Sequence, residues 1–307
     1  MFKNSVSQMA LMSAGWKMIP TWRICRCGLE AFCAAIGFVW LMIEPATYFK
    51  PDLQGKLAPY WPYLIGFGIV WVIVRLGLLA HEHAPKLSAC FRVDGSNTLL
   101  ELMVGDLFQI DGALIIPSSI TFDTDTNNQT ISPQSIQGQF TRISYQSVDH
   151  LDSDLQSALS SRTPSRTVGM DEKPFGKRKE YPLGTCVRLD TGKTVAYFLA
   201  LTKYNRDKTS QATMDELKIA LEEMWKQIRS CGELEDLKTP VIGAARSRIN
   251  ESPENLIKEI VRSFTAAVSE GPFCKSLRIV VHPTDLERAQ IKFENLIRFA
   301  ESHACHR

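Results

Sequence analysis

The stretch that decides the fold is VGDLFQIDGALIIPSS, residues 104–119. A Gly-Asp pair stands ahead of the apolar run at 113–118, and the small polar residues Ser118 and Ser119 end that run. A short apolar run between turn residues is typical of a strand that is buried on both faces. The stretch therefore predicts a central strand with one carboxylate, Asp106, before it and small polar residues after it.

Strand-like and helix-like patterns alternate along the rest of the chain after residue 97. Apolar runs predict further strands at 98–104, 185–189, 194–202, 239–244 and 277–282. Apolar stripes and N-terminal capping residues predict helices at 135–145, 151–160 and 214–230, from Pro253, and after Thr284 and Glu287. Near-continuous apolar strands separated by amphipathic helices predict an α/β fold with helices on both faces of one sheet.

One segment of this region has a clear helix signal, and another has the composition of a loop. The helix at 214–230 has the clearest start, because Thr213 and Glu216 form the pattern of a capping box. Residues 161–182 are polar and rich in Arg, Lys and Pro, which predicts a mobile loop. The stretch KPFGKRK, 173–179, is interpreted as a solvated part of that loop, with contact to anionic lipid or ligand as the alternative.

Charge and cysteine content exclude two classes of site. The 307 residues carry a net charge of +2, with a pI of about 8.1, which is too mild an excess to predict a nucleic-acid partner. The eight cysteines include no C-x-x-C pair, which favours reduced thiols. The end of the chain holds His303, Cys305 and His306, but a single terminal cluster favours a frayed tail over 303–307 rather than zinc, so no metal is predicted.

Two apolar segments precede the α/β region, at 27–43 and at about 57–78. Each approaches the ~20 residues that a helix needs to cross ~30 Å of hydrocarbon. Tyr and Trp residues cluster near the ends of the pair, and Lys and Arg in the outer flanks predict that both termini lie in the cytoplasm. The alternatives are a cleaved signal peptide, which the late start of the first segment disfavours, and a buried core hairpin.

The predicted order is a membrane hairpin over 1–80, a connector over 81–97, an α/β domain over 98–302 and a tail over 303–307. Three glycines, Gly37, Gly66 and Gly68, lie within the predicted spans. Small residues let membrane helices approach closely, so these glycines indicate either contact between hairpins of different copies or the ordinary tolerance of membrane helices for glycine.

Ligands of an open α/β sheet bind beyond the carboxyl ends of its strands. Two such ends carry suitable residues, IIPSSITFD at 115–123 and VIGAARSRINESPEN at 241–255. The second offers Gly243 for close approach of the backbone, the cations Arg246 and Arg248, and a helix N-terminus. Together these features suit an anion such as a diphosphate, and a turn with solvated arginines is the alternative.

The order of these pieces resembles a macrodomain, the ADP-ribose-binding fold, over about residues 97–302. The resemblance implies a three-layer α/β/α domain with a mixed sheet. It also implies that Asp106 accepts a hydrogen bond from the adenine amino group. By the same resemblance, residues 117–122 hold the distal ribose and phosphate, and residues 242–246 wrap the diphosphate.

Four further segments resemble the macrodomain of the Thoeris antiphage effectors: ISPQSIQGQF (131–140), YPLGTCVRL (181–189), FLALTKYN (198–205) and PVIGAARSRI (240–249). The apolar hairpin resembles the transmembrane form of these effectors. The ligand-binding residues implied by both resemblances are Asp106, Pro117, Ser118, Ser119, Ile120, Phe122, Gly138, Gln139, Tyr204, Ile242, Gly243, Ala244, Ala245, Arg246 and Arg248.

In such systems a TIR-domain enzyme makes a nucleotide signal from NAD on infection. The resemblance therefore implies an effector whose macrodomain binds an ADP-ribose derivative, as histidine-linked ADP-ribose in the transmembrane type. Binding then leads to homo-oligomerisation and disruption of the bacterial inner membrane. The implied location is that membrane, as a multi-pass protein with a cytoplasmic macrodomain and the lipid bilayer as a partner.

Departures from the usual macrodomain pattern argue against catalysis. Many macrodomains have NAAN after the second strand, and hydrolases use its asparagine to orient substrate, whereas this chain has PSSITFD at 117–123. The late loop has one glycine where many members have two. We therefore expect no enzymatic activity and no cofactor. The alternatives are a membrane-tethered ADP-ribosyl hydrolase, with Asp123 and Asn205 as the candidates for its base or orienting amide, and a tethered binding module that does not kill.

Overall fold

The computed structural model describes residues 21–49, 61–82, 88–126, 130–204, 209–244 and 249–305. The chain divides into two compact units, Met1–Lys86 and Leu87–Arg307. Each unit has its own internal packing and is described by itself.

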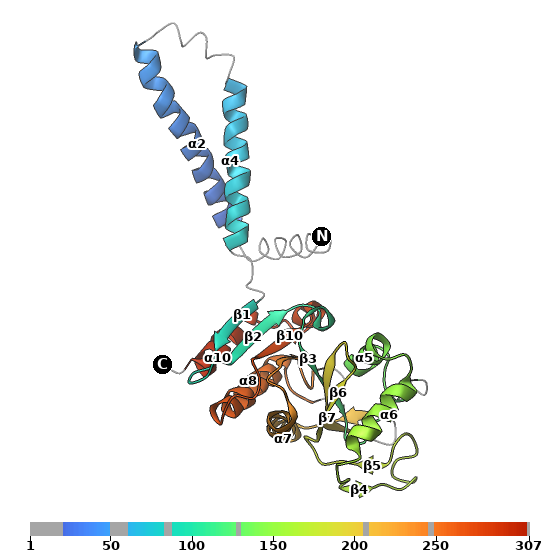
Figure 1. Cartoon of the computed structure of the whole chain (residues 1–307). Helices are drawn as coiled ribbons and strands as arrows, with labels where there is room; N and C mark the ends of the chain where they lie inside the picture. The colour runs from blue at the N-terminus through green and yellow to red at the C-terminus, as the bar shows by residue number, and fades with distance from the viewer. Residues whose placement is uncertain are drawn as a thin grey trace. The chain divides into compact units, whose positions relative to one another are not determined.

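The first unit contains a helical hairpin made of α2 (Thr21–Phe49) and α4 (Trp61–Glu82) (Figure 1). Gly68 lets the two helices approach, because a Cβ at this position would lie 2.9 Å from the ring of Phe32. A Cβ added at Gly37 or at Gly66 would meet open space. Gly68 is therefore explained by packing within the hairpin.

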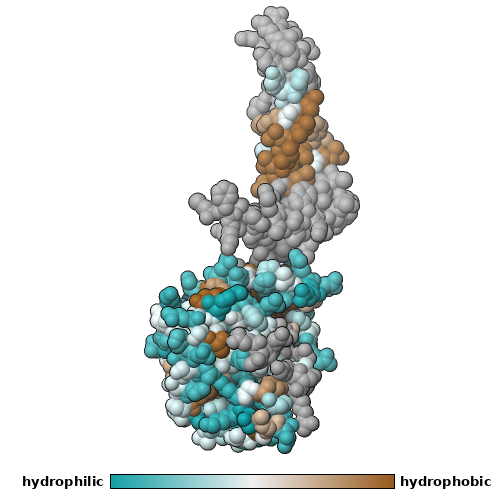
Figure 2. Space-filling view, turned by 90° about the vertical axis from the view of Figure 1, so that its right-hand side faces the viewer, coloured by the Kyte–Doolittle hydropathy of each residue, from teal (hydrophilic) through white to brown (hydrophobic). Residues whose placement is uncertain are grey.

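Large apolar side chains cover much of the hairpin surface (Figure 2). Leu41 is 72% exposed on α2, and Ile73 is 63% exposed on α4. Among the described residues of the hairpin, Ala31, Ala35 and Gly68 are buried, whereas many larger apolar side chains are exposed.

The prediction of a multi-pass location in the inner membrane is wrong. Among the described residues, no helix has the length and apolar character needed to cross a bilayer. Charged side chains lie inside the two helices, including Arg26 and Glu30, which form an exposed ion pair of 2.7 Å in α2, and Arg75 in α4. The described helices therefore do not support the predicted spans or the orientation inferred from their flanks.

The second unit is built on one mixed sheet (Figure 1). Its strands are β1 (Ser88–Arg92), β2 (Leu99–Val104), β3 (Ala113–Ser119), β6 (Cys186–Asp190), β7 (Val195–Tyr204), β8 (Ser210–Gln211), β9 (Asp236–Pro240) and β10 (Ser276–Val281). Their order is β1-β2-β10-β9-β3-β7-β6, and β8 pairs with β7. Strands β2, β10, β9, β3 and β7 are parallel to one another, whereas β1 and β6 run antiparallel at the two edges.

Helices cover both faces of this sheet, so the predicted three-layer α/β/α domain is confirmed. One face packs against α7 (Met214–Cys231), α8 (Pro253–Ser269) and α10 (Phe293–Ala304). The other packs against α5 (Ile136–Ser144), α6 (Val148–Leu159) and the short helix η2 (Leu107–Gln109). Strand β3 supplies Ile115 to the first core and Leu114 and Ile116 to the second, as a strand buried on both faces should.

Several predicted helix starts are confirmed by their hydrogen bonds. Thr213 and Glu216 form the capping box of α7, and Ser252 caps α8 ahead of Pro253. The expected box of Thr284 and Glu287 is wrong. Instead His282 caps the short helix α9 (Pro283–Arg288), and α10 follows as a separate helix.

Three other boundaries differ from the predictions. The predicted connector contains β1, whose alternating exposed and half-buried residues gave no apolar run. Strand β9 ends at Pro240, so the apolar residues predicted as a strand over 239–244 mostly follow it. The expected mobile loop over 161–182 contains a small antiparallel pair, β4 (Arg166–Thr167) and β5 (Lys179–Glu180).

Phe264→Ala is expected to lower the free energy of unfolding of the Leu87–Arg307 unit by about 3–5 kcal/mol. Phe264 is fully buried, and its ring meets the rings of Trp225 and Phe273 at 5.6 and 5.8 Å between centroids. Ile219→Ala is the control, since Ile219 is 51% exposed on α7. Urea unfolding followed by circular dichroism measures both, and equal losses in the two variants would contradict this account of the core.

Candidate ligand-binding site

The parallel strands deliver their carboxyl ends to one edge of the sheet. Strand β9 lies beside β3 and β10, and β10 lies beside β2, so the segments after these strands meet at that edge. Asp106 follows β2, Ile120 follows β3, and Ile242 follows β9. An open α/β sheet binds ligands beyond this edge, which makes it the candidate site.

Asp106 is exposed and lies two residues after the end of β2. Its Oδ1 accepts from the backbone N–H of Phe108 at 3.0 Å, which caps η2, and its Oδ2 accepts from Gln109 Nε2 at 3.0 Å. A carboxylate has about four acceptor positions, so further donors can still be accepted. The geometry leaves Asp106 able to meet a ligand from solvent.

Two cations on the sheet face hold the segment that follows Asp106. Lys238 of β9 is 5% exposed and donates to the carbonyl of Ile110 at 2.5 Å. Arg278 of β10 donates to the carbonyl of Asp111 at 2.9 Å. Burial lowers the pKa of Lys238, while the charges of Asp111 and Asp106 act in the opposite direction. These cations were not predicted from the sequence, because they lie in strands rather than in a motif.

The predicted residues at the end of β3 are mostly interior. Pro117 is half-buried, whereas Ser118, Ser119, Ile120 and Phe122 are buried. The pairing of β3 with β7 shifts between Ser118 and Ser119, and Ile120 N–H donates to Thr202 O at 2.8 Å. The two serines are therefore buried, and their hydroxyl groups make hydrogen bonds inside the protein, to Gln137 and Asp123.

Phe122 adopts an unusual backbone conformation, with a φ of 51°. A bulky residue in this region is strained and persists only where its surroundings hold it. The Phe122 ring is fully buried against Tyr181 at 5.6 Å between centroids, and its N–H donates to Ser119 O at 2.9 Å. Strain of this kind clusters at functional loops.

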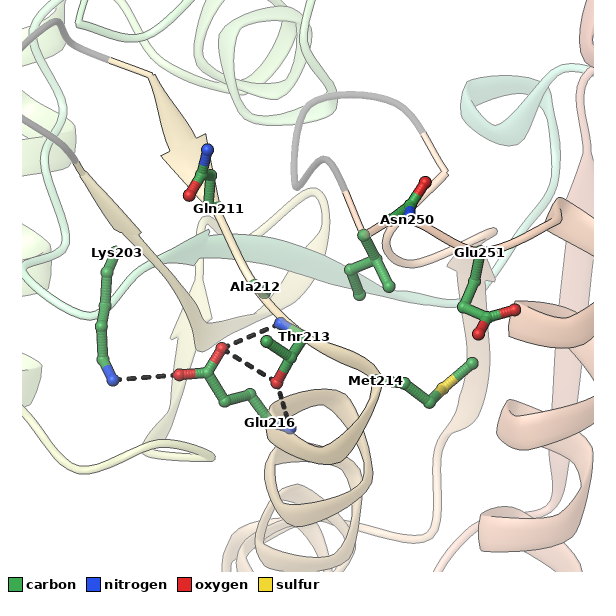
Figure 3. A pocket seen from close by; sticks show the side chains of 9 residues that line it. Lys203, Gln211, Ala212, Thr213, Met214, Glu216, Asn250 and Glu251 are labelled. Carbon is green, nitrogen blue, oxygen red and sulfur yellow. Dashed lines mark hydrogen bonds and ion pairs between the residues drawn. The ribbon is translucent and has the colours of Figure 1, made fainter.

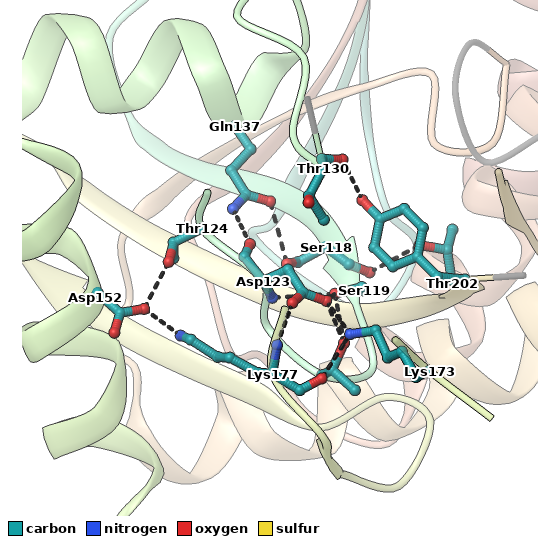
Figure 4. Close-up of polar contacts among 12 residues, drawn as sticks. Ser118, Ser119, Asp123, Thr124, Thr130, Gln137, Asp152, Lys173, Lys177 and Thr202 are labelled. Atoms are coloured by element: carbon teal, nitrogen blue, oxygen red, sulfur yellow. Dashed lines mark hydrogen bonds and ion pairs between the residues drawn. The ribbon is translucent and has the colours of Figure 1, made fainter. Parts of the chain in front are cut away.

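A buried polar cluster is centred on Asp123, the residue after Phe122 (Figure 4). It was not predicted from the sequence. Asp123, which is 1% exposed, accepts at Oδ2 from Ser119 Oγ, Thr121 Oγ1 and Lys173 Nζ, at 3.2, 2.5 and 2.6 Å. Its Oδ1 accepts from the backbone N–H of Lys177 at 2.7 Å. The cluster joins residues that lie about fifty positions apart in the chain.

Two other side chains complete the cluster. Gln137 of α5 accepts from Ser118 Oγ at 3.2 Å and donates to Asp123 O at 2.7 Å. Asp152 of α6 accepts from Thr124 Oγ1 at 2.6 Å and pairs with the ammonium of Lys177. The pKa of Asp152 is lowered, because the hydrogen bonds and charge of Lys177 and the bond from Thr124 outweigh the effect of burial.

The interpretation of 173–179 as a solvated segment is wrong at Lys173, whose side chain is 7% exposed. A lysine among the basic residues of a polar stretch gives no local sign of burial. The Asp123 carboxylate, together with Thr121 Oγ1 and the carbonyl of Lys177, makes the position acceptable for a cation once the fold brings these groups close.

Three further predicted ligand residues lie on two elements. Gly138 and Gln139 belong to α5, and Tyr204 ends β7. Gly138 is buried, and Gln139 and Tyr204 are half-buried. A Cβ at Gly138 would lie 2.3 Å from the carbonyl oxygen of Ser132, so the first turn of α5 needs glycine for packing. Tyr204 donates its hydroxyl to the carbonyl of Thr130 at 2.9 Å. These contacts fix the segment before α5 against β7.

The late loop after β9 begins with Ile242 and Gly243, which are buried, and Ala244, which is exposed. Gly243 has a φ of 95°, which only glycine adopts readily. A Cβ there would lie 2.7 Å from Ile249 Cδ1, so the glycine also serves close packing. Ala245, Arg246 and Arg248 lie outside the described residues, as does the hydrolase candidate Asn205.

A hollow of about 500 Å³ lies where the chain leaves β7 and enters α7 and α8 (Figure 3). Its described lining is Lys203, Gln211, Ala212, Thr213, Met214, Glu216, Ile249, Asn250 and Glu251. Glu216 serves the capping box and also accepts from Lys203 at 3.0 Å, so both charges already have partners. None of the predicted ligand residues that the structure describes lines this hollow.

Within the described ranges, no group of three or more His, Cys, Asp or Glu residues could hold a metal ion. His303 belongs to α10 and stacks on Phe299 at 4.0 Å between centroids, so the prediction of a frayed tail is wrong at His303. The described cysteines are free thiols. Burial raises the pKa of Cys274 to about 12, which marks it as an unreactive core thiol.

The chain matches the family model of the Thoeris protein ThsA Macro domain over residues 100–282. Solved structures with a similar fold include a macrodomain of Oceanobacillus iheyensis with ADPR, at 10% identity and a TM-score of 0.46, covering 69% of this chain and 99% of that one. The ganglioside induced differentiation associated protein 2 (GDAP2) macro domain matches at 12% identity and 0.43, covering 66% and 83%. A search of curated proteins finds no match.

The family model covers more than half of the chain, from β2 to the end of β10. The chain therefore belongs to the Thoeris ThsA Macro domain family. Its sheet order and its two helical layers define the macrodomain class of α/β fold.

Gly138→Ala is expected to lower the free energy of unfolding by about 1–3 kcal/mol, because an added methyl group overpacks α5 against Ser132. Gln134→Ala is the control, since Gln134 is exposed beside the same contact. Denaturant unfolding compares the two. If Gly138→Ala unfolds like the wild type and only loses ligand, Gly138 serves the ligand rather than the packing.

Proposed function

We propose that this protein is a non-enzymatic effector of antiphage defence whose macrodomain binds an ADP-ribose derivative. The observation that carries the proposal is the ThsA Macro domain match together with the exposed carboxylate of Asp106 at the carboxyl edge of the sheet. A carboxylate in this position can accept a hydrogen bond from the amino group of adenine. The capped N-terminus of α8 and the glycine turn before it suit a diphosphate.

Binding without hydrolysis is the favoured form of the proposal. Hydrolysis needs a base that can reach a water or substrate proton. Asp123, the candidate base, is buried and accepts four hydrogen bonds from the protein. The buried Ser118 and Ser119 stand where hydrolases of this fold present an asparagine. These features support a receptor rather than a catalyst.

The signal itself is proposed from the family. We infer that it is an ADP-ribose derivative made from NAD by a TIR-domain enzyme, with histidine-linked ADP-ribose as the specific candidate. Ala245, Arg246 and Arg248 remain the proposed phosphate-binding part of the late loop.

Oligomerisation on binding is the proposed output. Exposed apolar surface as extensive as that of α2 and α4 marks an interaction surface in most proteins. We propose that other copies of the chain cover it when the signal is bound. The ligand must then bind the assembling state more tightly than the resting state, because only differential affinity shifts the equilibrium.

Asp106→Ala is expected to weaken the affinity for ADP-ribose about ten- to hundredfold. This range corresponds to the roughly 1.5–3 kcal/mol of a hydrogen bond to a charged group, with tenfold per 1.4 kcal/mol. Isothermal titration calorimetry measures the dissociation constant. Asp111→Ala is the matched control, since Asp111 is an exposed carboxylate in the same segment. Unchanged affinity in Asp106→Ala would refute the placement of adenine.

Light scattering of the full chain is expected to show a ligand-dependent increase in mass when ADP-ribose or histidine-linked ADP-ribose is added. Asp106→Ala should need a correspondingly higher ligand concentration for the same increase. Binding by calorimetry without any growth would remove the oligomerisation step. Release of free ADP-ribose from an ADP-ribosylated protein would instead establish a hydrolase.

A further inference from the structure

The strap is the loop of residues 168–178 that joins β4 to β5, and its Lys173 reaches into the protein interior. Lys173 Nζ donates to Thr121 Oγ1 at 2.8 Å, to Asp123 Oδ2 at 2.6 Å and to the carbonyl of Lys177 at 2.6 Å. An ammonium group has three N–H donors. All three are used inside the protein, so none is left for a ligand (Figure 4).

Aromatic rings enclose the same ammonium group. Lys173 Nζ lies 5.5 Å from the ring centroid of Phe175 and 5.6 Å from that of Tyr204. Cations at this distance are attracted by the electron-rich face of a ring. The two rings also meet each other at 5.8 Å between centroids. One lysine thus joins the strap to the turn after β3 and to the end of β7.

The charge of Lys173 is held by its surroundings. Burial lowers the pKa of Lys173, and the neighbouring charge of Lys177 acts in the same direction, whereas the hydrogen bond and charge of Asp123 and the charge of Glu180 raise it. A buried ion pair becomes strongly unfavourable when one partner is removed, because the other charge stays uncompensated. Lys173 and Asp123 therefore require each other. Separating the strap from the turn costs free energy, because it leaves the buried Asp123 carboxylate unpaired.

The turn that Lys173 contacts is the strained one. Thr121 and Asp123 stand on either side of Phe122, whose φ is 51°. Lys173 bonds both of these flanking side chains. Because a strained residue persists only where its surroundings over-determine it, the two bonds help to hold Phe122 in place.

The close approach of the strap to Asp123 also depends on Gly176. Gly176 has a φ of 63°, and a Cβ there would lie 2.1 Å from Asp123 Oδ1. Glycine alone lets the strap backbone come close enough for the Lys177 N–H to donate to the same oxygen.

We propose that Lys173 is a positioning residue of the ligand site, which fixes the turn of residues 120–124 through Thr121 and Asp123. The inference rests on the proposed function, because it takes the segment after β3 as part of the ADP-ribose site. The strap sets the shape of the wall against which the distal part of the ligand lies, and Lys173 never touches the ligand.

The first test compares Lys173→Met with Lys179→Met in the full chain. Both remove one positive charge, but Lys179 is exposed on β5. Hydrogen exchange of the backbone amides of residues 120–124 is expected to speed up at least tenfold in Lys173→Met and to stay unchanged in Lys179→Met. Unchanged protection of these amides in Lys173→Met would overturn the proposal without reference to any ligand.

The second test measures ADP-ribose affinity by calorimetry. The temperature is chosen so that near-ultraviolet circular dichroism shows each variant to be folded. Lys173→Met is expected to raise the dissociation constant at least tenfold. The neutral pair Lys173→Met/Asp123→Asn is expected to regain thermal stability while its affinity stays weak. A neutral pair that binds like the wild type would show that the lysine serves only stability and would overturn the positioning role.

Gly176→Ala provides a variant that keeps both charges. It is expected to displace the Asp123 carboxylate and to weaken ADP-ribose binding in the same direction as Lys173→Met. Wild-type affinity in this variant would overturn the role given to the strap. A wild-type protein that shows no ADP-ribose binding, but does show the loss of amide protection in Lys173→Met, would instead refute the proposed function and confine Lys173 to holding the turn.

Discussion

The buried ion pair of Lys173 and Asp123 is the interaction on which the arrangement of the candidate site depends. Two opposite charges inside a protein are tolerated only when each satisfies the other and their remaining donors and acceptors are filled. The structure meets this condition with Thr121, Ser119 and the backbone of Lys177. The strap, the strained turn at Phe122 and the end of β3 are therefore coupled, because moving any of them leaves a buried charge unpaired.

This coupling separates the support of the site from its contacts. The side chains of Ser118, Ser119 and Asp123 face the interior, so the end of β3 offers a ligand mainly its backbone and its shape. Asp106 is different, because it is exposed and keeps acceptor capacity after capping η2. This arrangement is the basis for proposing that a rigid framework binds a nucleotide, rather than that a free acid or base performs chemistry there.

The elements that could be predicted were those whose own residues carry the signal. Strands β3 and β7 are apolar along their length, and α7 and α8 have caps within their own first turn. Strand β9 was misplaced because DLKTP reads as polar, although Lys238 is buried there against the carbonyl of Ile110. The apolar segments of the hairpin predicted membrane spans, which the helices of the described residues do not support.

The sequence by itself determined the fold class and the macrodomain resemblance, and it predicted the edge of the sheet for a ligand, because periodicity, caps and strand order are local or sequential properties. The tertiary structure alone decided which polar residues are free to bind. Lys173 looks like a surface lysine in the sequence and Ser118 looks like a rim residue, yet both are buried. Burial of a charge depends on a partner fifty residues away, and only folding brings that partner within hydrogen-bonding distance.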